Sequence, residues 1–417
     1  VIEFLRSSTV LRWMLAALGV VVVLSVLQEL ARPATIDLVS VGTAESTLRR
    51  AVPILLAGLG GIWAERAGVV NIGLEGMMVL GTWFGAWGAL EFGPWWGIVI
   101  GIAGGAAGGL LHAVATVGFG VDHIVSGVAI NIVAPALARF LSGEVFSGRS
   151  GGGITQSPRV DSVGHFDLPF LSGGELLGWR TPDLLGWTTD QDWLLVSDIA
   201  AVLSGITSSL SWATLLALTL VPVSIFVLWR TPFGLRIRAS GEHPVAADSL
   251  GVSVYRMKFT AVVTSGALAG FGGAFIAIEQ TGVYREGQVQ GRGFIGLATV
   301  IFGNWQPVGA LLGSILFGFA DALQLRDRTA VHALLLLAGV ALAGLALRAL
   351  LKRRHSSALL LASSSAAVLW WYAVTEEVAG ELPPITPHLV TLLVVVFATG
   401  RLRMPAANGL RYRRGQE

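Results

Sequence analysis

The chain has 417 residues and a net charge of +2; 53% of its residues are hydrophobic, 13% are charged, and its mean hydropathy is +0.71. Runs of about 18 or more nearly uncharged residues match the length that crosses a bilayer core. This composition excludes a soluble globular domain. It predicts an all-α polytopic membrane protein, because the apolar runs are continuous and lack the two-residue alternation of a barrel. The absence of cysteine excludes disulfides, thiolate metal sites and cysteine nucleophiles.

Residues 1–142 are predicted to form a first transmembrane half with five spans. Arg6 and Arg12 precede an apolar run at 13–30, which is too long for the core of a signal peptide. Counting of positive charges therefore places the N-terminus in the cytoplasm. The four later spans begin near residues 51, 69, 95 and 123 and are separated by short polar turns.

Polar side chains within these spans are candidates for function, because a carboxylate in lipid costs roughly 2.5–3.5 kcal/mol or more. Asn71 and Glu75 are predicted to line a substrate pathway. For Glu75, a helix cap and an ion pair with Arg66 stay open as alternatives. For Asn131, a contact between helices and a contact with substrate are equally compatible with its position. Asp122 is expected to be the N-cap of the span that follows it.

Residues 143–210 differ in kind, because glycine, serine, proline, tryptophan and acidic residues replace the apolar runs. The segment is predicted to be a long extracytoplasmic loop without a separate folded domain. Its acidity does not conflict with charge counting, which applies to short loops. The loop is compatible with a lid or with a docking surface for a binding protein.

Residues 211–328 are predicted to form a second transmembrane half. After a span at 212–229, the polar stretch 230–256 concentrates arginine and lysine, which places it on the cytoplasmic side. Two small residues, Ala246 and Ala247, precede Gly251 in an A-A-x-x-x-G spacing. On a short helix these side chains leave a shallow face that another protein can approach, and the glycine lets the backbone turn.

The rest of this half suggests an internal repeat and a broken helix. A span at 259–278 contains A-G-F-G-G, which resembles A-G-L-G-G at residues 57–61, and Glu279 follows it as Glu65 follows the first copy. The two copies run in opposite directions, as in an inverted repeat. The apolar piece within 291–309 is too short for a full span, so a short or broken helix is expected, of the kind that brings backbone groups to a midplane pathway. Glu279 and Asn304 are also predicted to line the substrate pathway.

A further span is predicted at 308–325, and three more apolar runs follow it, which brings the predicted number of spans to about 12. Residues 329–384 are expected to hold an inserted helix pair, with the basic cluster Lys352–Arg354 on the cytoplasmic side. Residues 385–417 are expected to form a last helix, at 389–399, and a basic cytoplasmic tail.

Several strings resemble the permeases of ABC importers in the simple-sugar and nucleoside (branched-chain-permease-like) family, closest to the nucleoside-importing branch. They are E-R-A-G-V-V-N-I-G-L-E-G-M-M (65–78), D-H-I-V-S-G-V-A-I-N (122–131), R-T-P-F-G (230–234) with A-S-G-E (239–242), the stretch 291–309, and P-A-A-N-G-L-R-Y (405–412). The resemblance covers most of the chain outside 143–210 and the inserted pair. Relatives commonly have ten spans, so the pair at 329–384 departs from the pattern.

The resemblance implies a multi-pass plasma-membrane permease that does no covalent chemistry and needs no cofactor of its own. Its partners would be an ABC ATPase subunit, a second permease subunit, identical or different, and an extracytoplasmic substrate-binding protein, with no nucleic acid. ATP would be bound by the partner, since neither Lys258 nor Lys352 is followed by the serine or threonine of a phosphate loop. The residues expected to contact the ATPase are Arg238, Gly241, Glu242, Ala246, Ala247 and Gly251.

Two other classes of function make different demands on the sequence. An ion-coupled secondary transporter would use Glu75, Glu279 and Asp321 as ion sites, but it has no use for an ATPase-docking loop. An intramembrane enzyme is disfavoured, because His112, Asp122 and His123 do not form H-E-x-x-H and no G-x-S-x-G elbow occurs. Sugars, nucleosides and bases all stay compatible with the few polar side chains.

Overall fold

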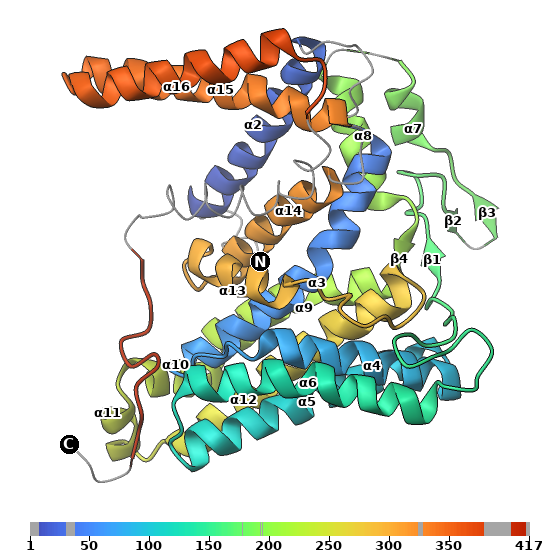
Figure 1. Ribbon diagram of the computed structural model, residues 1–417, viewed down its shortest axis with the longest axis vertical. Helices are drawn as coiled ribbons and strands as arrows, with labels where there is room; N and C mark the ends of the chain where they lie inside the picture. Colours follow the sequence, from blue (N-terminus) through green and yellow to red (C-terminus); the bar gives the residue numbers. More distant parts are fainter. Residues whose placement is uncertain are drawn as a thin grey trace. The chain divides into compact units, whose positions relative to one another are not determined.

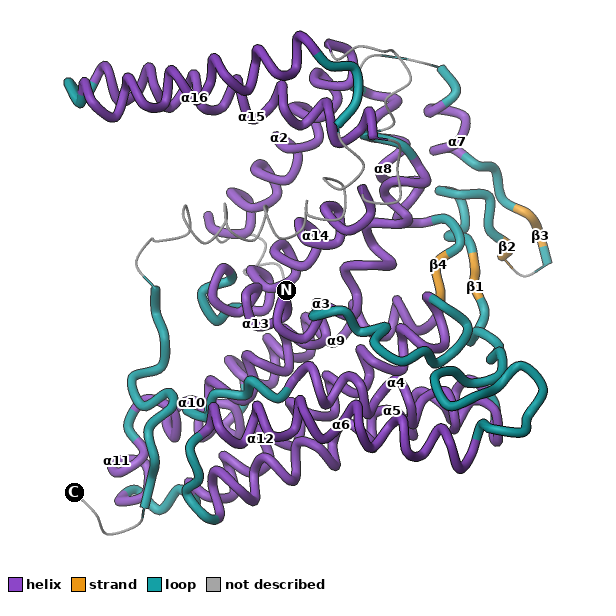
Figure 2. Tube along the Cα trace, viewed as in Figure 1, coloured by secondary structure: helices purple, strands orange, loops and turns teal. Residues whose placement is uncertain are grey.

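The computed structural model describes residues 8–30, 38–176, 178–191, 193, 195–323, 328–378 and 402–413. In this part of the chain, helices dominate and strands are very short (Figures 1 and 2). The expectation of a helical polytopic membrane protein is confirmed. The long helices are α2 (Ser8–Leu30), α3 (Val41–Arg66), α4 (Leu74–Phe92), α5 (Pro94–Ala113), α6 (His123–Val145), α9 (Trp212–Arg230), α12 (Val254–Phe275), α14 (Pro307–Leu323), α15 (Arg328–Leu351) and α16 (His355–Val374).

The remaining elements are short. The short helices are α7 (Leu184–Thr189), α8 (Val196–Thr207), α10 (Pro232–Glu242), α11 (Pro244–Ser249), α13 (Arg292–Phe302) and the π-helical turns η1 (Val114–Gly118) and η2 (Ile276–Gln280). The strands pair as β1 (His165–Phe166) with β4 (Leu210–Ser211) and β2 (Glu175–Leu176) with β3 (Trp179–Arg180). The sheet content is therefore confined to the polar segment and its end.

Six helical stretches of the described chain are long and apolar enough to cross a membrane, namely 94–118, 123–145, 212–230, 254–280, 332–351 and 355–374. Shorter apolar helices lie at 18–29, 196–207, 292–302 and 307–323. The count of about 12 spans is not confirmed and stays a prediction. The expected last helix at 389–399 falls outside the described residues.

Two element boundaries differ from expectation. Helix α3 begins at Val41, about ten residues before the predicted start near Ala51, because it continues as a helix through the polar residues Glu45, Arg49 and Arg50. Helix α8 was not predicted at all, although its residues are apolar. Its 12 residues are too few to give a membrane-span signal, so hydropathy alone could not separate it from a loop.

The chain forms two compact units. The larger unit comprises residues 48–165, 211–318 and 390–417, and the smaller comprises 1–47, 166–210 and 319–389. The two predicted halves, 1–142 and 211–328, thus contribute most of their residues to the same unit. The polar segment 143–210 is divided after His165, so its first part packs with the larger unit.

The core of the larger unit is built by α4, α5 and α12, which pack against one another, with α6 beside α4 (Figure 1). Glycines make the close approach possible. An added Cβ at Gly105 of α5 would clash with the backbone of Gly266 and Gly270 of α12. Small residues at such crossings let helices gain van der Waals contact where no hydrophobic effect drives association.

The smaller unit contains a two-helix hairpin of α15 and α16. Ser365 on α16 donates a hydrogen bond to the carbonyl of Gly339 on α15 at 2.8 Å, and Leu369 lies against the same glycine. A separate apolar cluster joins Leu27 of α2 with Leu323 and Ala333.

Candidate functional site

Two asparagines hold the non-helical stretch that precedes α4. The amide of Asn71 donates to the Ser265 hydroxyl at 2.9 Å and accepts the Gly73 N–H at 3.1 Å. Asn131 accepts the Gly76 N–H at 2.7 Å and donates to the Ile72 carbonyl at 2.9 Å. Residues 71–73 are not helical, and the first N–H groups of α4 have no partner within the helix, so these side chains supply the partners that a buried backbone requires.

The Glu75 carboxylate caps another helix. Its Oε1 accepts the N–H of Gly291 and its Oε2 accepts the N–H of Gly293, both at 2.8 Å. These groups form the N-terminal end of α13, where free N–H groups and the helix dipole favour a negative charge. Of the two alternatives for Glu75, the structure shows the cap. Arg66 instead donates to the Trp305 carbonyl at 2.9 and 3.2 Å.

Asn304 lies beyond the other end of α13. The helix has 11 residues, so the expected short helix is confirmed and its length of roughly 16 Å separates Glu75 from Asn304. The Asn304 side chain accepts the backbone N–H of Arg403 at 2.6 Å. Next to it, Trp305 donates to Glu65 at 2.5 Å, and Asn408 donates to the same carboxylate oxygen at 2.9 Å. The C-terminal tail therefore joins α3 and the α13–α14 turn.

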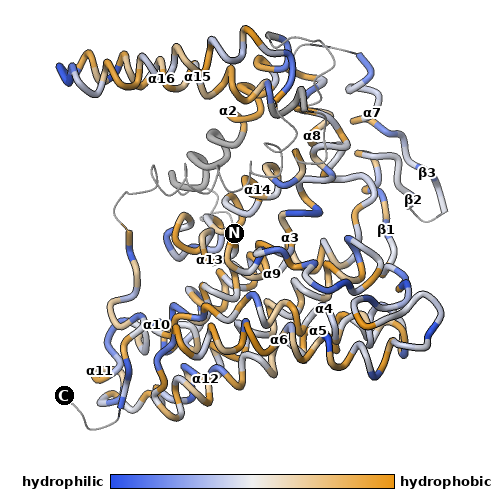
Figure 3. Tube along the Cα trace, in the orientation of Figure 1, coloured by the Kyte–Doolittle hydropathy of each residue, from blue (hydrophilic) through white to orange (hydrophobic). Residues whose placement is uncertain are grey.

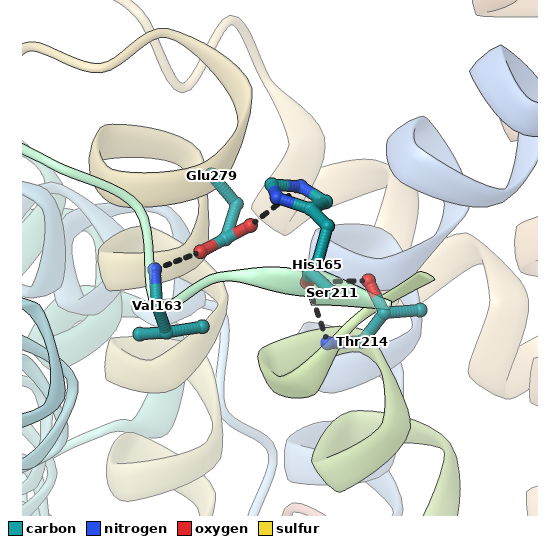
Figure 4. A network of polar contacts seen from close by, with 5 residues as sticks. All are labelled: Val163, His165, Ser211, Thr214 and Glu279. Atoms are coloured by element: carbon teal, nitrogen blue, oxygen red, sulfur yellow. Dashed lines mark hydrogen bonds and ion pairs between the residues drawn. The ribbon is translucent and has the colours of Figure 1, made fainter. Parts of the chain in front are cut away.

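Glu279 lies in the π-helical turn η2 and joins it to the polar segment (Figure 4). Its Oε1 accepts the Val163 N–H at 2.9 Å, and its Oε2 lies 3.4 Å from Nε2 of His165. The Glu279 side chain is only 2% exposed, whereas that of His165 is 33% exposed. Nearby, Ser157 and Tyr284 exchange hydrogen bonds, and burial raises the pKa of Tyr284 to about 12.

The five pathway candidates thus occupy three places in the larger unit rather than one cluster. Asn71, Glu75 and Asn131 surround the start of α4; Glu279 contacts the 157–165 segment; and Asn304 contacts the tail. Their assignment to a substrate pathway stays a prediction. Ser265, Trp305 and Asn408 carried no separate signal in the sequence, since each acts on a residue distant in the chain.

The stretch 230–256 folds into the helices α10 and α11. Gly241 at the end of α10 packs against the backbone of Arg66 and Gly68, and its carbonyl accepts the Ala407 N–H at 2.9 Å. Glu242 accepts the Ala406 N–H at 3.1 Å. Both residues therefore join α10 to the tail within the larger unit.

An aromatic stack braces the same region. The guanidinium groups of Arg66 and Arg238 lie 5.3 and 5.8 Å from the ring centre of Trp229, and Nε of Arg238 donates to the Leu228 carbonyl at 2.9 Å. Cation–π contacts of this kind stabilise by about 0.5–2 kcal/mol. Arg238 is thus half-buried beneath the surface of the segment.

The outer face of this region belongs to α11. Ala246 is exposed, Val245 is 54% exposed and Leu250 is 84% exposed, whereas Ala247 is buried. Gly251 has a φ of +82°, a left-handed conformation that lets the chain turn back toward α12, and no atom lies within 4 Å of the position of an added Cβ. The A-A-x-x-x-G spacing therefore yields one outward alanine, one inward alanine and a turn.

Helix α6 starts at the predicted cap. The Asp122 carboxylate accepts the N–H groups of Ile124 and Val125, and these hydrogen bonds hold the pKa of Asp122 below its usual range. His112, in α5, contacts the Ser126 hydroxyl at 2.9 Å and the Val70 carbonyl at 3.1 Å, which makes it a packing residue. Within the described ranges, no three His, Asp or Glu side chains are placed to hold a metal ion.

Residues 43–340 match the model of the family described as "Branched-chain amino acid transport system / permease component". The chain is 36% identical over 287 residues to the guanosine ABC transporter permease protein NupQ of Bacillus subtilis, covering 67% of this chain and 81% of that protein. It is 36% identical over 280 residues to the nucleoside ABC transporter permease protein NupC of Lactococcus lactis, covering 65% and 78%.

A further relative is the putative glucose ABC transporter permease protein TsgC13 of Haloferax volcanii, 34% identical over 291 residues, with 69% of this chain and 78% of that protein covered. No solved structure matches the chain at a significant level. The matched residues include the starts of α4 and α13, the α10–α11 segment and most of both predicted halves. The chain therefore belongs to the family of branched-chain-type transport permeases and is a permease subunit of an ABC transporter.

Proposed function

We propose that this permease imports nucleosides, driven by ATP that is bound and hydrolysed on separate ATPase subunits. The observation that carries the substrate class is the 36% identity to two nucleoside or guanosine permeases over 78–81% of their lengths. The permease supplies the pathway and no covalent chemistry, so it needs no cofactor of its own.

The outer face of α11 is the proposed docking surface for the ATPase. Val245, Ala246 and Leu250 are exposed there, and α10 behind them is braced by Trp229 and by the tail. Arg238, Gly241 and Ala247 are half-buried or buried and are proposed to support this surface from within, whereas Glu242 is exposed beside it and is also proposed to contact the ATPase. Movement of α11 is then passed to α3 through the contact between Gly241 and Arg66, and from α3 to α13 through Glu65 and Trp305.

The pathway is proposed to run beside the start of α4 and the start of α13. Asn71, Glu75 and Asn131 hold interrupted backbone there, which is the arrangement that exposes polar groups at mid-membrane in transporters with broken helices. Glu279, which contacts the 157–165 segment, and Asn304, which contacts the tail, are proposed to control access to it.

The assembly is proposed to contain two permease subunits and an extracytoplasmic substrate-binding protein. About 12 spans are proposed from the apolar runs and cytoplasmic termini from charge counting, with residues 143–210 facing the binding protein. The contacts among Gly68, Gly241 and Ala407 support one shared face for the 230–256 stretch and the tail.

The test is purification of the tagged chain in mild detergent, followed by uptake of labelled guanosine and glucose in cells with and without it. Co-purification of an ATPase and uptake of guanosine are expected. Uptake of glucose alone would favour the simple-sugar alternative, which the 34% identity to TsgC13 supports. Uptake without any ATPase, abolished by a protonophore, would establish the ion-coupled transporter and overturn the proposal.

A further inference from the structure

The hairpin of α15 and α16 ends in a strongly basic turn. Lys352, Arg353 and Arg354 are all exposed there, and Arg348 precedes them by one helical turn. No aspartate or glutamate occurs between residues 328 and 375, so no acidic residue of the hairpin offsets these charges. Figure 3 shows the hydrophilic turn at the tip of two largely apolar helices.

The sides of this hairpin face away from the protein. Only 11% of each span is buried, compared with 83% of the span at 254–280. Leu347, Leu359 and Leu360 are 58%, 73% and 68% exposed. Since the hairpin is apolar and of membrane-spanning length, its exposed sides contact lipid.

A groove of about 700 Å³ lies between the two helices beside the basic turn. Its apolar walls are Ala346, Leu347, Leu350, Ala358, Leu359 and Ala362, while His355 and Ser356 stand at its polar end. Leu347 and Leu359 are each five residues from the basic turn, or about 8 Å along a helix. With the basic turn at the level of the lipid headgroups, the groove therefore begins at the depth where the acyl chains begin.

We propose that this groove and turn form a binding site for an anionic phospholipid. One acyl chain lies along the apolar walls, and the phosphate contacts Lys352, Arg353 and Arg354, with His355 at the entrance. The apolar walls suit a hydrocarbon chain, and positive charges with no acidic residue in the hairpin select an anionic headgroup over a zwitterionic one. The site lies in the inserted pair and does not depend on the transported substrate.

The test is native mass spectrometry of the purified chain after exchange into mixed micelles containing phosphatidylglycerol or phosphatidylcholine. Wild-type protein is expected to retain phosphatidylglycerol in preference to phosphatidylcholine. The triple variant Lys352→Gln, Arg353→Gln, Arg354→Gln is expected to lose roughly tenfold or more of this retention, given the attraction per basic side chain at a membrane surface. The variant Ala362→Trp fills the groove and is expected to lower retention with the charges intact.

Matched controls separate lipid binding at this site from general effects of positive charge and of side-chain size. Arg403, Arg411 and Arg413 are exposed in the tail, so their joint replacement by glutamine removes as many charges away from the groove. Ser364→Trp adds the same bulk at an exposed position of α16 that does not line the groove. Both controls are expected to retain lipid as wild type does.

Three outcomes of the charge test would overturn the proposal. They are equal retention of the two lipids by wild type, undiminished retention in the triple glutamine variant of the basic turn, and an equal loss in that variant and in the triple glutamine control of the tail. Retention in Ala362→Trp equal to that in Ser364→Trp would also overturn it, because the groove would then play no part. Co-purification of a protein that binds the hairpin and excludes lipid would also overturn the proposal, because the hairpin would then bind a protein partner.

Discussion

Glu75 shows at the scale of one residue why a carboxylate can be buried in a membrane protein. Its two oxygens accept the N–H groups of Gly291 and Gly293, which otherwise have no partner at the start of α13. The charge thus meets the positive end of a helix dipole instead of lipid. Gly293 is required for this approach, because an added Cβ would lie 2.5 Å from the backbone of Glu75.

Replacement of Glu75 by glutamine tests this cap. Glutamine keeps one acceptor oxygen but turns an NH₂ group toward a backbone N–H, so one donor of α13 loses its partner. We expect a loss of about 1–3 kcal/mol in the free energy of unfolding and reduced transport. Thermal unfolding in detergent measures the first.

Glu91→Gln is the matched control, because it makes the same change in an ion pair with Arg149 whose side chains are 33–42% exposed. Such pairs contribute about 0–1 kcal/mol. An equal fall in melting temperature for both variants would refute the cap as a stabilising contact.

At the scale of elements, α5 and α12 meet through glycines. Since Gly105 lies against the backbone of Gly266 and Gly270, any side chain there must separate the two helices. Helix pairs in membranes depend on this close packing, because lipid tails are as apolar as leucine and no hydrophobic effect drives the helices together. The exposed face of α11 shows the opposite arrangement, with large apolar side chains left uncovered by the permease.

Gly105→Ala is therefore expected to destabilise the protein by about 1–3 kcal/mol, through overpacking of the α5–α12 contact. Gly143→Ala serves as its control, because an added Cβ at this position of α6 meets nothing within 4 Å. The control is expected to be neutral or to stabilise by about 0.5–1 kcal/mol. Comparable unfolding temperatures for the two variants would contradict the proposed role of the glycine contact.

Leu250→Ser tests the docking face of α11. Loss of an exposed leucine at an interface is expected to weaken ATPase binding roughly tenfold, with insertion and melting temperature unchanged. The control is Leu184→Ser, an exposed leucine of the polar segment. Ala247→Arg is a poorer probe, since Ala247 is buried and the variant would also disturb folding. Normal ATPase co-purification with Leu250→Ser would rule out this face.

At the scale of the whole molecule, charge counting predicts that the polar segment 143–210 and the basic turns lie on opposite sides of the membrane. Because the chain contains no cysteine, a single introduced cysteine is its only target for a thiol-reactive label. The family match ends at residue 340, within α15, so the position of the hairpin tip is a separate test of the predicted number of spans.

Single cysteines at Lys352 and at Trp187 test this topology. We expect a membrane-impermeant maleimide to label Trp187→Cys in intact cells and Lys352→Cys only after permeabilisation. Both side chains are exposed, so accessibility in the protein does not limit the reaction. Labelling of both positions from outside would exclude the predicted sidedness of the α15–α16 turn.

The sequence by itself determined the class of protein, most of the long helices, the cap at Asp122, the short helix α13 and the family. These depend on local signals: apolar runs of fixed length, a capping side chain, a break after about ten residues, and contiguous motifs. The start of α3 and the whole of α8 were missed, because polar helical residues and short apolar helices look like loops when only hydropathy is read.

Only the tertiary structure decided what the polar side chains contact. For Glu75, the choice between a cap and an ion pair depended on Gly291 and Gly293, more than 200 residues away, whereas its place in a substrate pathway stays a prediction. Likewise, Ala246 and Ala247 are adjacent alanines that the sequence does not distinguish, yet Ala246 is exposed and Ala247 is buried. Hydrogen bonds and burial depend on which residues lie close together in space. Spacing in the sequence predicts such proximity only within a single helix or turn.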